Sequence, residues 1–214
     1  ISMSGLIGGG TAYASWTARP AQLPITAQED LAQRCRDYLG HPPGAPEGPG
    51  IPTNADLQGT DLVLADTRGD WSYVVLRGAN SLEATCLIDD SSGWSILPGR
   101  ASASAGSYGF IDTPTPAADE VFGTSLMGMS ADEGSYWTTE GHVGSNVRSV
   151  QIVTDSGMTI DATLTGGRFA AWWPERVTVD DAGGLAQVRY RITLADGTVL
   201  GPLTYGEINP PPSD

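Results

Sequence analysis

The sequence predicts a mainly β fold: an antiparallel β-sandwich or a small barrel with one N-terminal α-helix. The 214 residues include 28 glycines and 15 prolines, which favour short strands joined by turns over a helical bundle. The C-terminal third alternates apolar and polar residues with the period of a half-buried strand. Helical periodicity, by contrast, is clear in one segment only, residues 26–39.

The composition excludes two broad classes of protein. Hydrophobic residues make up 40% of the chain and charged residues 17%. This is enough apolar material to fold, so the chain as a whole is not an intrinsically disordered protein. The formal net charge is −14, and all eleven cationic side chains are arginine. Because nucleic-acid binding requires a basic surface, we expect no nucleic-acid partner.

The helix is predicted by both of its ends. Thr26 and Glu29 have the spacing of a capping box. Gly40 follows the last apolar residue as a stop signal. Three side chains at helical spacing form one apolar face: Leu31, Cys35 and Leu39.

The middle of the chain predicts one group of strands and one irregular segment. After a Pro/Gly linker over 41–55, we expect strands at 61–66, 71–77 and 83–88. The first two are apolar on both faces, which is typical of a central hairpin. Residues 89–135 have a weaker pattern, so they form either a functional loop or short strands.

The clearest strand pattern lies near the C-terminus. Four apolar residues alternate with polar ones and should face one core: Met158, Ile160, Ala162 and Leu164. Gly166-Gly167 then predicts a turn into a strand at 168–173, and Asp196-Gly197 predicts a second hairpin turn after 187–194.

These elements predict a domain organisation in three parts: a membrane-proximal tail or linker at 1–24, an extracytoplasmic β domain at 25–205 and a Pro-rich tail at 206–214. The β domain can consist of two sheets or subdomains, 25–97 and 136–205, joined by an irregular segment, 98–135.

The two cysteines indicate the compartment. Cys35 and Cys86 form no C-x-x-C motif and no cluster with histidine. An even count in this acidic chain suggests one disulfide and an oxidising environment. Two buried free thiols in a cytosolic protein are the alternative.

The N-terminal residues support the same compartment. Residues 4–16 are small and apolar but too few to span a bilayer, which takes about 20 residues. Tyr13 and Trp16 would lie at the membrane–water interface, so residues 4–16 are typical of the outer end of a membrane helix. We therefore expect a membrane tether before residue 1; an ordinary flexible tail is the alternative.

Four segments carry a resemblance to a known family: residues 64–71, 85–87, 141–147 and 167–174. They resemble an uncharacterised family of membrane-anchored extracytoplasmic β domains from high-GC Gram-positive bacteria, some of which are anti-sigma-factor-like. The resemblance implies a surface-facing domain with a cysteine pair that follows a single transmembrane helix. It implies no catalytic residues, because the shared motifs are structural.

The histidines and carboxylates give little indication of catalysis. His41 lies in the Pro/Gly linker and His142 in a Gly-rich turn, and no G-x-S-x-G elbow accompanies them. Their spacing from the cysteines matches no zinc pattern. Three acidic pairs lie at expected turns without a calcium-loop motif: Asp89-Asp90, Asp132-Glu133 and Asp180-Asp181. We expect no metal, cofactor or catalytic residue, although a glycosidase-type carboxylate pair stays open.

Aromatic side chains are better candidates for binding. Trp172 and Trp173 are adjacent in a strand and so point to opposite faces, and Trp137 lies in another expected strand. An exposed tryptophan suits a glycan or peptide, whereas core packing is the favoured reading for both Trp172 and Trp173. Arg68-Gly69-Asp70 spells an integrin-binding tripeptide, but a tight turn before an apolar strand explains it better.

Together these features predict a non-enzymatic extracytoplasmic binding or sensing domain of a membrane-anchored envelope protein. Its partner would be an envelope protein, a peptide or a glycan. Two alternatives stay open: an envelope hydrolase that uses loop carboxylates, and a structural surface or assembly protein.

Overall fold

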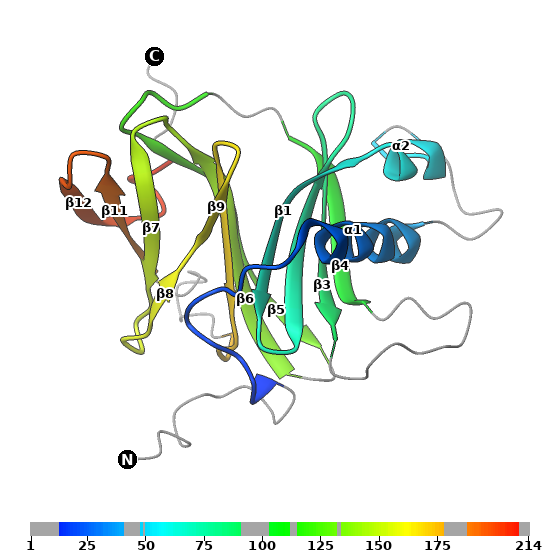
Figure 1. Cartoon of the computed structure of the whole chain (residues 1–214), viewed down its shortest axis with the longest axis horizontal. Coiled ribbons are helices and arrows are strands. Elements are labelled where there is room, and N and C mark those ends of the chain that lie inside the picture. Colours follow the sequence, from blue (N-terminus) through cyan, green and yellow to red (C-terminus); the bar gives the residue numbers. More distant parts are fainter. Residues whose placement is uncertain are drawn as a thin grey trace. The chain divides into compact units, whose positions relative to one another are not determined.

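The structure is a computed structural model that describes residues 13–40, 48, 50–90, 103–111, 115–131, 134–177 and 188–209. These residues form three antiparallel sheets and confirm the mainly β fold with an N-terminal helix (Figure 1). The chain divides into two units, each described separately below. The helix–sheet unit spans Ala21–Asp112, and the sandwich unit comprises Thr113–Asp214 with the residues up to Pro20.

The helix–sheet unit is a four-stranded sheet with helices on it. Its strands occur in the order of the chain: β1 (Asp61–Arg68), β2 (Trp71–Arg77), β3 (Leu82–Asp89) and β4 (Ala103–Phe110). Helix α1 (Ile25–Leu39) contacts all four strands, and α2 (Asn54–Gln58) contacts α1. The expectation that the first two strands form a central hairpin is confirmed for β2, which is buried on both faces, and wrong for β1, which lies at the edge of the sheet and begins with exposed and half-buried residues.

Helix α1 begins two residues earlier than the capping pattern predicts. Its N-cap is Pro24, and no side chain caps it, so the expected box between Thr26 and Glu29 is wrong. Thr26 lies inside the first turn, where its hydroxyl cannot occupy the N-cap position. The helix ends at Leu39 as predicted, with Gly40 as the C-cap.

The predicted disulfide between Cys35 and Cys86 is present, and its Cα atoms lie 5.7 Å apart. It joins α1 to β3 inside the core of the helix–sheet unit. Gly106 on β4 lets the helix approach, because a Cβ there would lie 2.8 Å from Leu39 Cδ2. The disulfide is typical of proteins in oxidising, extracytoplasmic environments.

The sandwich unit consists of two four-stranded sheets. One has the order β5 (Val121–Ala131), β6 (Gly134–Val143), β10 (Arg168–Trp173) and β9 (Thr163–Thr165). The other has the order β12 (Val199–Thr204), β11 (Arg189–Leu194), β7 (Val147–Val153) and β8 (Thr159–Asp161). Inward side chains of both sheets form one apolar core. Within it, the rings of Phe169 and Tyr190 meet edge to face at 6.3 Å.

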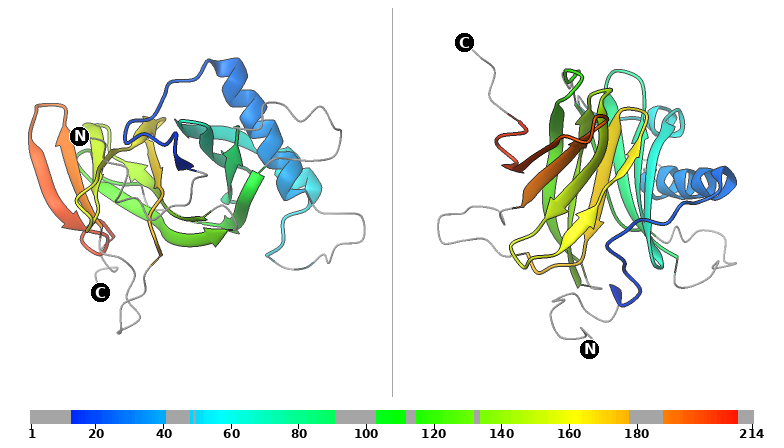
Figure 2. Two further views of the ribbon diagram at one scale, coloured as in Figure 1. Left: turned by 90° about the horizontal axis from the view of Figure 1, so that it is seen from below. Right: turned by 60° about the vertical axis from the view of Figure 1, so that its left-hand side comes forward.

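The alternating segment near the C-terminus is two short strands and not one. β8 pairs with β7, whereas β9 pairs with β10, so the chain changes sheets at Ala162 (Figure 2). Its predicted inward face is nevertheless confirmed, because Ile160 is fully buried and Met158 and Leu164 pack against the same core. Such a bend is a known way for one strand to form a corner between two sheets.

Three segments expected to be irregular are structured in part. The segment 98–135 contains all of β4 and β5 and the start of β6. Within the expected tail at 1–24, Tyr13 is buried and the Ala18 carbonyl accepts from the Asp161 amide at 2.9 Å. Near the other end of the chain, Ile208 belongs to the sandwich core.

Candidate functional site

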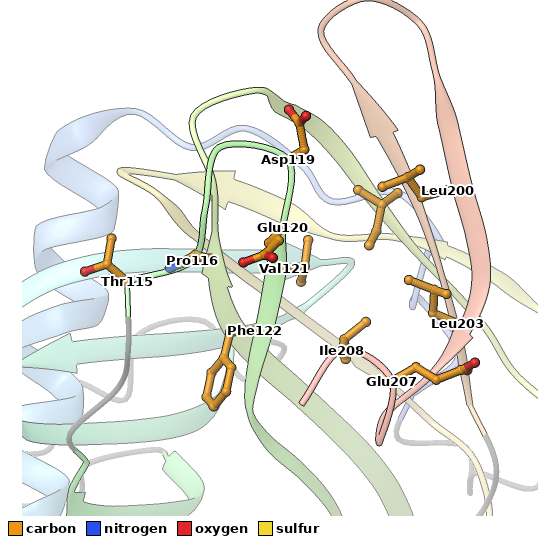
Figure 3. A pocket seen from close by; sticks show the side chains of 11 residues that line it. Thr115, Pro116, Asp119, Glu120, Val121, Phe122, Leu200, Leu203, Glu207 and Ile208 are labelled. Carbon is orange, nitrogen blue, oxygen red and sulfur yellow. The ribbon is translucent and has the colours of Figure 1, made fainter. Parts of the chain in front are cut away.

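A pocket of about 250 Å³ lies in the sandwich unit, between the start of β5 and strand β12 (Figure 3). One wall is the chain that leads into β5, and the other is β12 with the turn that follows it. Five aliphatic side chains contribute to its lining: Val121, Ile192, Leu200, Leu203 and Ile208. Three carboxylates complete it together with Thr115, Pro116 and Phe122: Asp119, Glu120 and Glu207.

The position of the pocket follows from the topology of the sandwich. β5 and β12 are edge strands, and no described strand joins them. At the other edge of the sandwich the two sheets are joined by the chain that runs from β8 into β9. The turn after β12 fills part of the open edge, because Tyr205 packs on Gly123 of β5 and its hydroxyl reaches the Gly123 carbonyl at 3.4 Å.

The wall before β5 is fixed by the turn between β6 and β7. The Gly144 amide donates to the Glu120 carbonyl at 2.8 Å, and the Asn146 amide donates to the Ala118 carbonyl at 2.8 Å. A Cβ at position 144 would lie 1.9 Å from the Ala117 carbonyl oxygen, so only glycine fits there. The Gly-rich motif at 141–147 thus has a structural role, in holding this wall.

Each carboxylate of the pocket accepts hydrogen bonds from a turn. Asp119 Oδ1 accepts from Asn146 Nδ2 at 2.7 Å, and Glu120 Oε2 accepts from the Ala117 amide at 3.0 Å. Glu207 Oε2 accepts from the amide and hydroxyl of Thr204 at 2.7 and 2.8 Å.

The hydrogen bonds from Thr204 favour the ionised form of Glu207. Its backbone and side-chain hydrogen bonds to Thr204 hold the pKa of Glu207 below its ordinary value of 4.5. The carboxylate is therefore anionic throughout the physiological pH range. An anionic rim around an aliphatic interior can attract a cation and bury an apolar group.

His142, one of the two histidine candidates, does not line the pocket. His142 on β6 accepts a hydrogen bond at Nε2 from Arg168 Nη1 at 2.7 Å, because a guanidinium can only donate. That nitrogen is therefore occupied by a structural partner. His41 lies outside the described residues.

The acidic pairs give no metal centre in the described part of the chain. Asp90 forms an ion pair with Arg34 of α1. The pairs Asp132-Glu133 and Asp180-Asp181 lie outside the described residues. Among the residues that are described, no three His, Cys, Asp or Glu side chains group as metal ligands. None of the helices in these residues is long and apolar enough to cross a bilayer.

The three candidate tryptophans are all buried. Trp137 and Trp173 belong to the core between the two sheets of the sandwich, where each is 0% exposed. Trp172 lies on the opposite face of its sheet and is also 0% exposed. Tyr13 and Trp16 pack edge-on against its ring, with centroids at 5.8 and 6.4 Å. A ligand could stack on any of these indoles only after neighbouring residues moved.

The integrin-like tripeptide has a structural explanation. Arg68 is fully buried and forms a two-bond ion pair with Asp66, with Nη2 donating to Oδ2 at 2.8 Å. Gly69 has a φ of 63°, which suits the turn between β1 and β2. The arginine of this tripeptide is therefore not available to a partner.

The pocket was not predicted from the sequence, since its residues come from separate segments. One local signal was present: Thr204 and Glu207 have capping-box spacing, which places a carboxylate at this turn. The fold and the pocket define a class, namely a disulfide-bonded, mainly β protein with a pocket at the open edge of a sandwich. Comparison with protein-family models, curated proteins and solved structures finds no match for the chain.

Proposed function

We propose that this chain is the extracytoplasmic binding or sensing part of a membrane-anchored envelope protein and that it is not an enzyme. The observation that carries the proposal is the pocket between β5 and β12, because an aliphatic cavity with a few polar groups is the usual form of a binding site. Its partner is an envelope protein, a peptide or a glycan.

The arrangement of the polar groups supports binding over catalysis. Each pocket carboxylate accepts hydrogen bonds from its own or an adjoining turn. A general acid or base requires a pKa close to the working pH, whereas that of Glu207 is lowered. His142, the other candidate base, accepts from Arg168.

The compartment rests on the Cys35–Cys86 disulfide, and the tether rests on the apolar N-terminal sequence. Tyr13 packs on the sandwich unit, through its aromatic contacts with Trp172 and Tyr136. A membrane helix before residue 1 would therefore attach to the unit that holds the pocket. Fractionation of the full-length gene product should recover it in membranes, and recovery in the soluble fraction would contradict the tether.

The binding role is tested by NMR titration of the ¹⁵N-labelled chain. The panel contains an N-acetylglucosamine trimer, short peptides and benzyl alcohol, with p-nitrophenyl esters and glycosides tested in parallel for turnover. We expect at least one ligand to shift the amides of Val121, Ile192 and Leu203, and no turnover. The Leu200→Trp variant should lose these shifts because the larger side chain fills the cavity. Turnover that Glu120→Gln abolishes, with no binding at these amides, would show that the protein is a hydrolase.

A further inference from the structure

We infer that the pocket receives one apolar side chain from a positively charged segment of a partner protein. This inference rests on the proposed binding function and names the ligand class of the same site. It follows from three properties of the pocket: its size, its charge and the strand edges beside it.

The size fits a side chain better than a complete small molecule. The pocket measures about 250 Å³. A dry cavity of about 150 Å³ accommodates benzene, and pockets for drug-sized ligands span about 300–1,000 Å³. The volume therefore suits a leucine or phenylalanine side chain with some clearance.

The charge selects the residues next to that side chain. The charged residues in the described lining are Asp119, Glu120 and Glu207, all of them acidic. Their hydrogen bonds to the turns fix the carboxylates at the edge of the cavity, so they do not have to be ordered again when a partner binds. The chain as a whole carries −14, which adds a long-range attraction for a basic partner.

The neighbouring strand edges favour insertion of a side chain over addition of a strand. β12 contains Pro202, which has no amide hydrogen to donate to a new strand. On β5, the Gly123 carbonyl already accepts from the Tyr205 hydroxyl at 3.4 Å, and the Tyr205 ring lies over Gly123. Backbone pairing beside the pocket is therefore obstructed on both edges, and the cavity itself is left as the point of contact.

The test uses the whole chain and four probes in NMR titrations. Three are capped pentapeptides: Gly-Lys-Leu-Arg-Gly, its acidic counterpart Gly-Glu-Leu-Glu-Gly, and Gly-Lys-Gly-Arg-Gly without the apolar side chain. The fourth is benzyl alcohol, which is apolar and neutral. We expect the first peptide to bind most tightly, to shift the amides of Val121, Ile192 and Leu203, and to weaken as salt is raised.

A charge variant tests the rim without altering the cavity. Asp119→Asn, Glu120→Gln and Glu207→Gln together keep the hydrogen-bond acceptors and remove three charges. We expect this variant to bind Gly-Lys-Leu-Arg-Gly about tenfold more weakly, since exposed charge pairs contribute modestly.

The matched control removes the same charge at exposed positions that do not line the pocket: Glu29→Gln, Asp61→Asn and Asp155→Asn. It should change the affinity less than about twofold, because exposed charges that do not line the pocket are screened by salt.

The outcomes separate this inference from the proposed function. Equal binding of the acidic peptide, or equal weakening by the control variant, would overturn the charge selection. Benzyl alcohol, or the N-acetylglucosamine trimer used to test the proposed function, could shift the pocket amides while neither basic peptide does. That result would overturn the ligand class and leave the binding function intact. Absence of pocket shifts with every probe would overturn both.

Discussion

The hydroxyl oxygens of Thr139 and Tyr190 lie 2.7 Å apart and join the two sheets of the sandwich through its core. Thr139 on β6 also donates to the Ser125 carbonyl at 3.0 Å. A carbonyl can only accept, so the threonine proton points to Ser125 and the tyrosine donates to Thr139. Both polar groups are thereby satisfied inside an apolar core.

Replacing Tyr190 with Phe should lower the free energy of unfolding by about 1 kcal/mol, the usual net value of a buried neutral hydrogen bond. Thr139 keeps its bond to Ser125, so no buried group is left without a partner. Urea unfolding measures the change. The exposed Tyr38→Phe is the matched control and should be neutral within about 0.5 kcal/mol. A loss of equal size at both positions would contradict the assignment.

The same tyrosine predicts alkaline instability. Burial raises the pKa of Tyr190 well above its ordinary value of 10.0. Above pH 10 the unfolded chain loses this proton while the folded chain retains it, so stability falls as pH rises, by up to about 1.4 kcal/mol per unit. Unfolding midpoints at pH 9 and 11 should diverge more in the native chain than in Tyr190→Phe. Identical pH dependence of the two chains would refute this.

Loss of the disulfide should destabilise the helix–sheet unit. The two cysteines are 51 residues apart, and closing a loop of that length in the unfolded chain is worth about 4 kcal/mol in the chain-entropy model. Mass analysis without reductant should show two hydrogens fewer than the reduced chain. The double variant Cys35→Ala, Cys86→Ala should unfold at lower urea concentration. Labelling of both thiols in the native, unreduced protein would contradict the bond.

Gly144→Ala should disturb the pocket wall. The added Cβ would lie 1.9 Å from a backbone oxygen, which side-chain movement cannot relieve, so we expect a loss of about 2 kcal/mol or more. Gly206→Ala is the control, since its Cβ would lie 4.0 Å from the Thr204 hydroxyl oxygen, an ordinary van der Waals contact. The backbone amide of Val121 should shift in NMR spectra of Gly144→Ala and stay in place in spectra of Gly206→Ala. A stable Gly144→Ala protein with native spectra would refute the role of this turn.

Substitutions along the bent segment from β8 to β9 should lower the free energy of unfolding by amounts that follow the burial of each side chain. Ile160 is 0% exposed, so Ile160→Ala should cost about 2–5 kcal/mol. Leu164→Ala should cost less because that side chain is only partly buried, and Thr163→Ala should cost under about 1 kcal/mol. Urea titrations of the three variants give the order. Equal losses at Ile160 and Thr163 would contradict the inward face.

Local patterns predicted those parts of the fold that depend on local chemistry. Gly166-Gly167 forms the expected turn, with φ values of 56° and 77° that only glycine adopts readily. The capping box expected at Thr26 failed because Pro24 is the N-cap, whereas Thr53 and Asp56 form one before α2. Identical spacing thus has different outcomes, because the preceding backbone decides where a helix begins.

Long-range packing explains what could not be predicted. Alternation through Ala162 is the same whether a strand stays in one sheet or changes to another. Gly128 looks unfavourable in a strand, yet a Cβ there would lie 2.9 Å from the Trp137 ring. The pocket joins residues 115–122 to 192–208, a contact between segments that no local pattern encodes.

The two edges of the sandwich are closed in different ways. At one edge the chain passes from β8 into β9 and so runs directly from one sheet into the other. At the opposite edge, β5 and β12 are joined by no backbone ladder within the described residues, and Tyr205 packs on Gly123. The pocket therefore lies where side-chain packing, and not strand pairing, closes the gap between the sheets, so a shorter side chain there would widen it without breaking a ladder hydrogen bond.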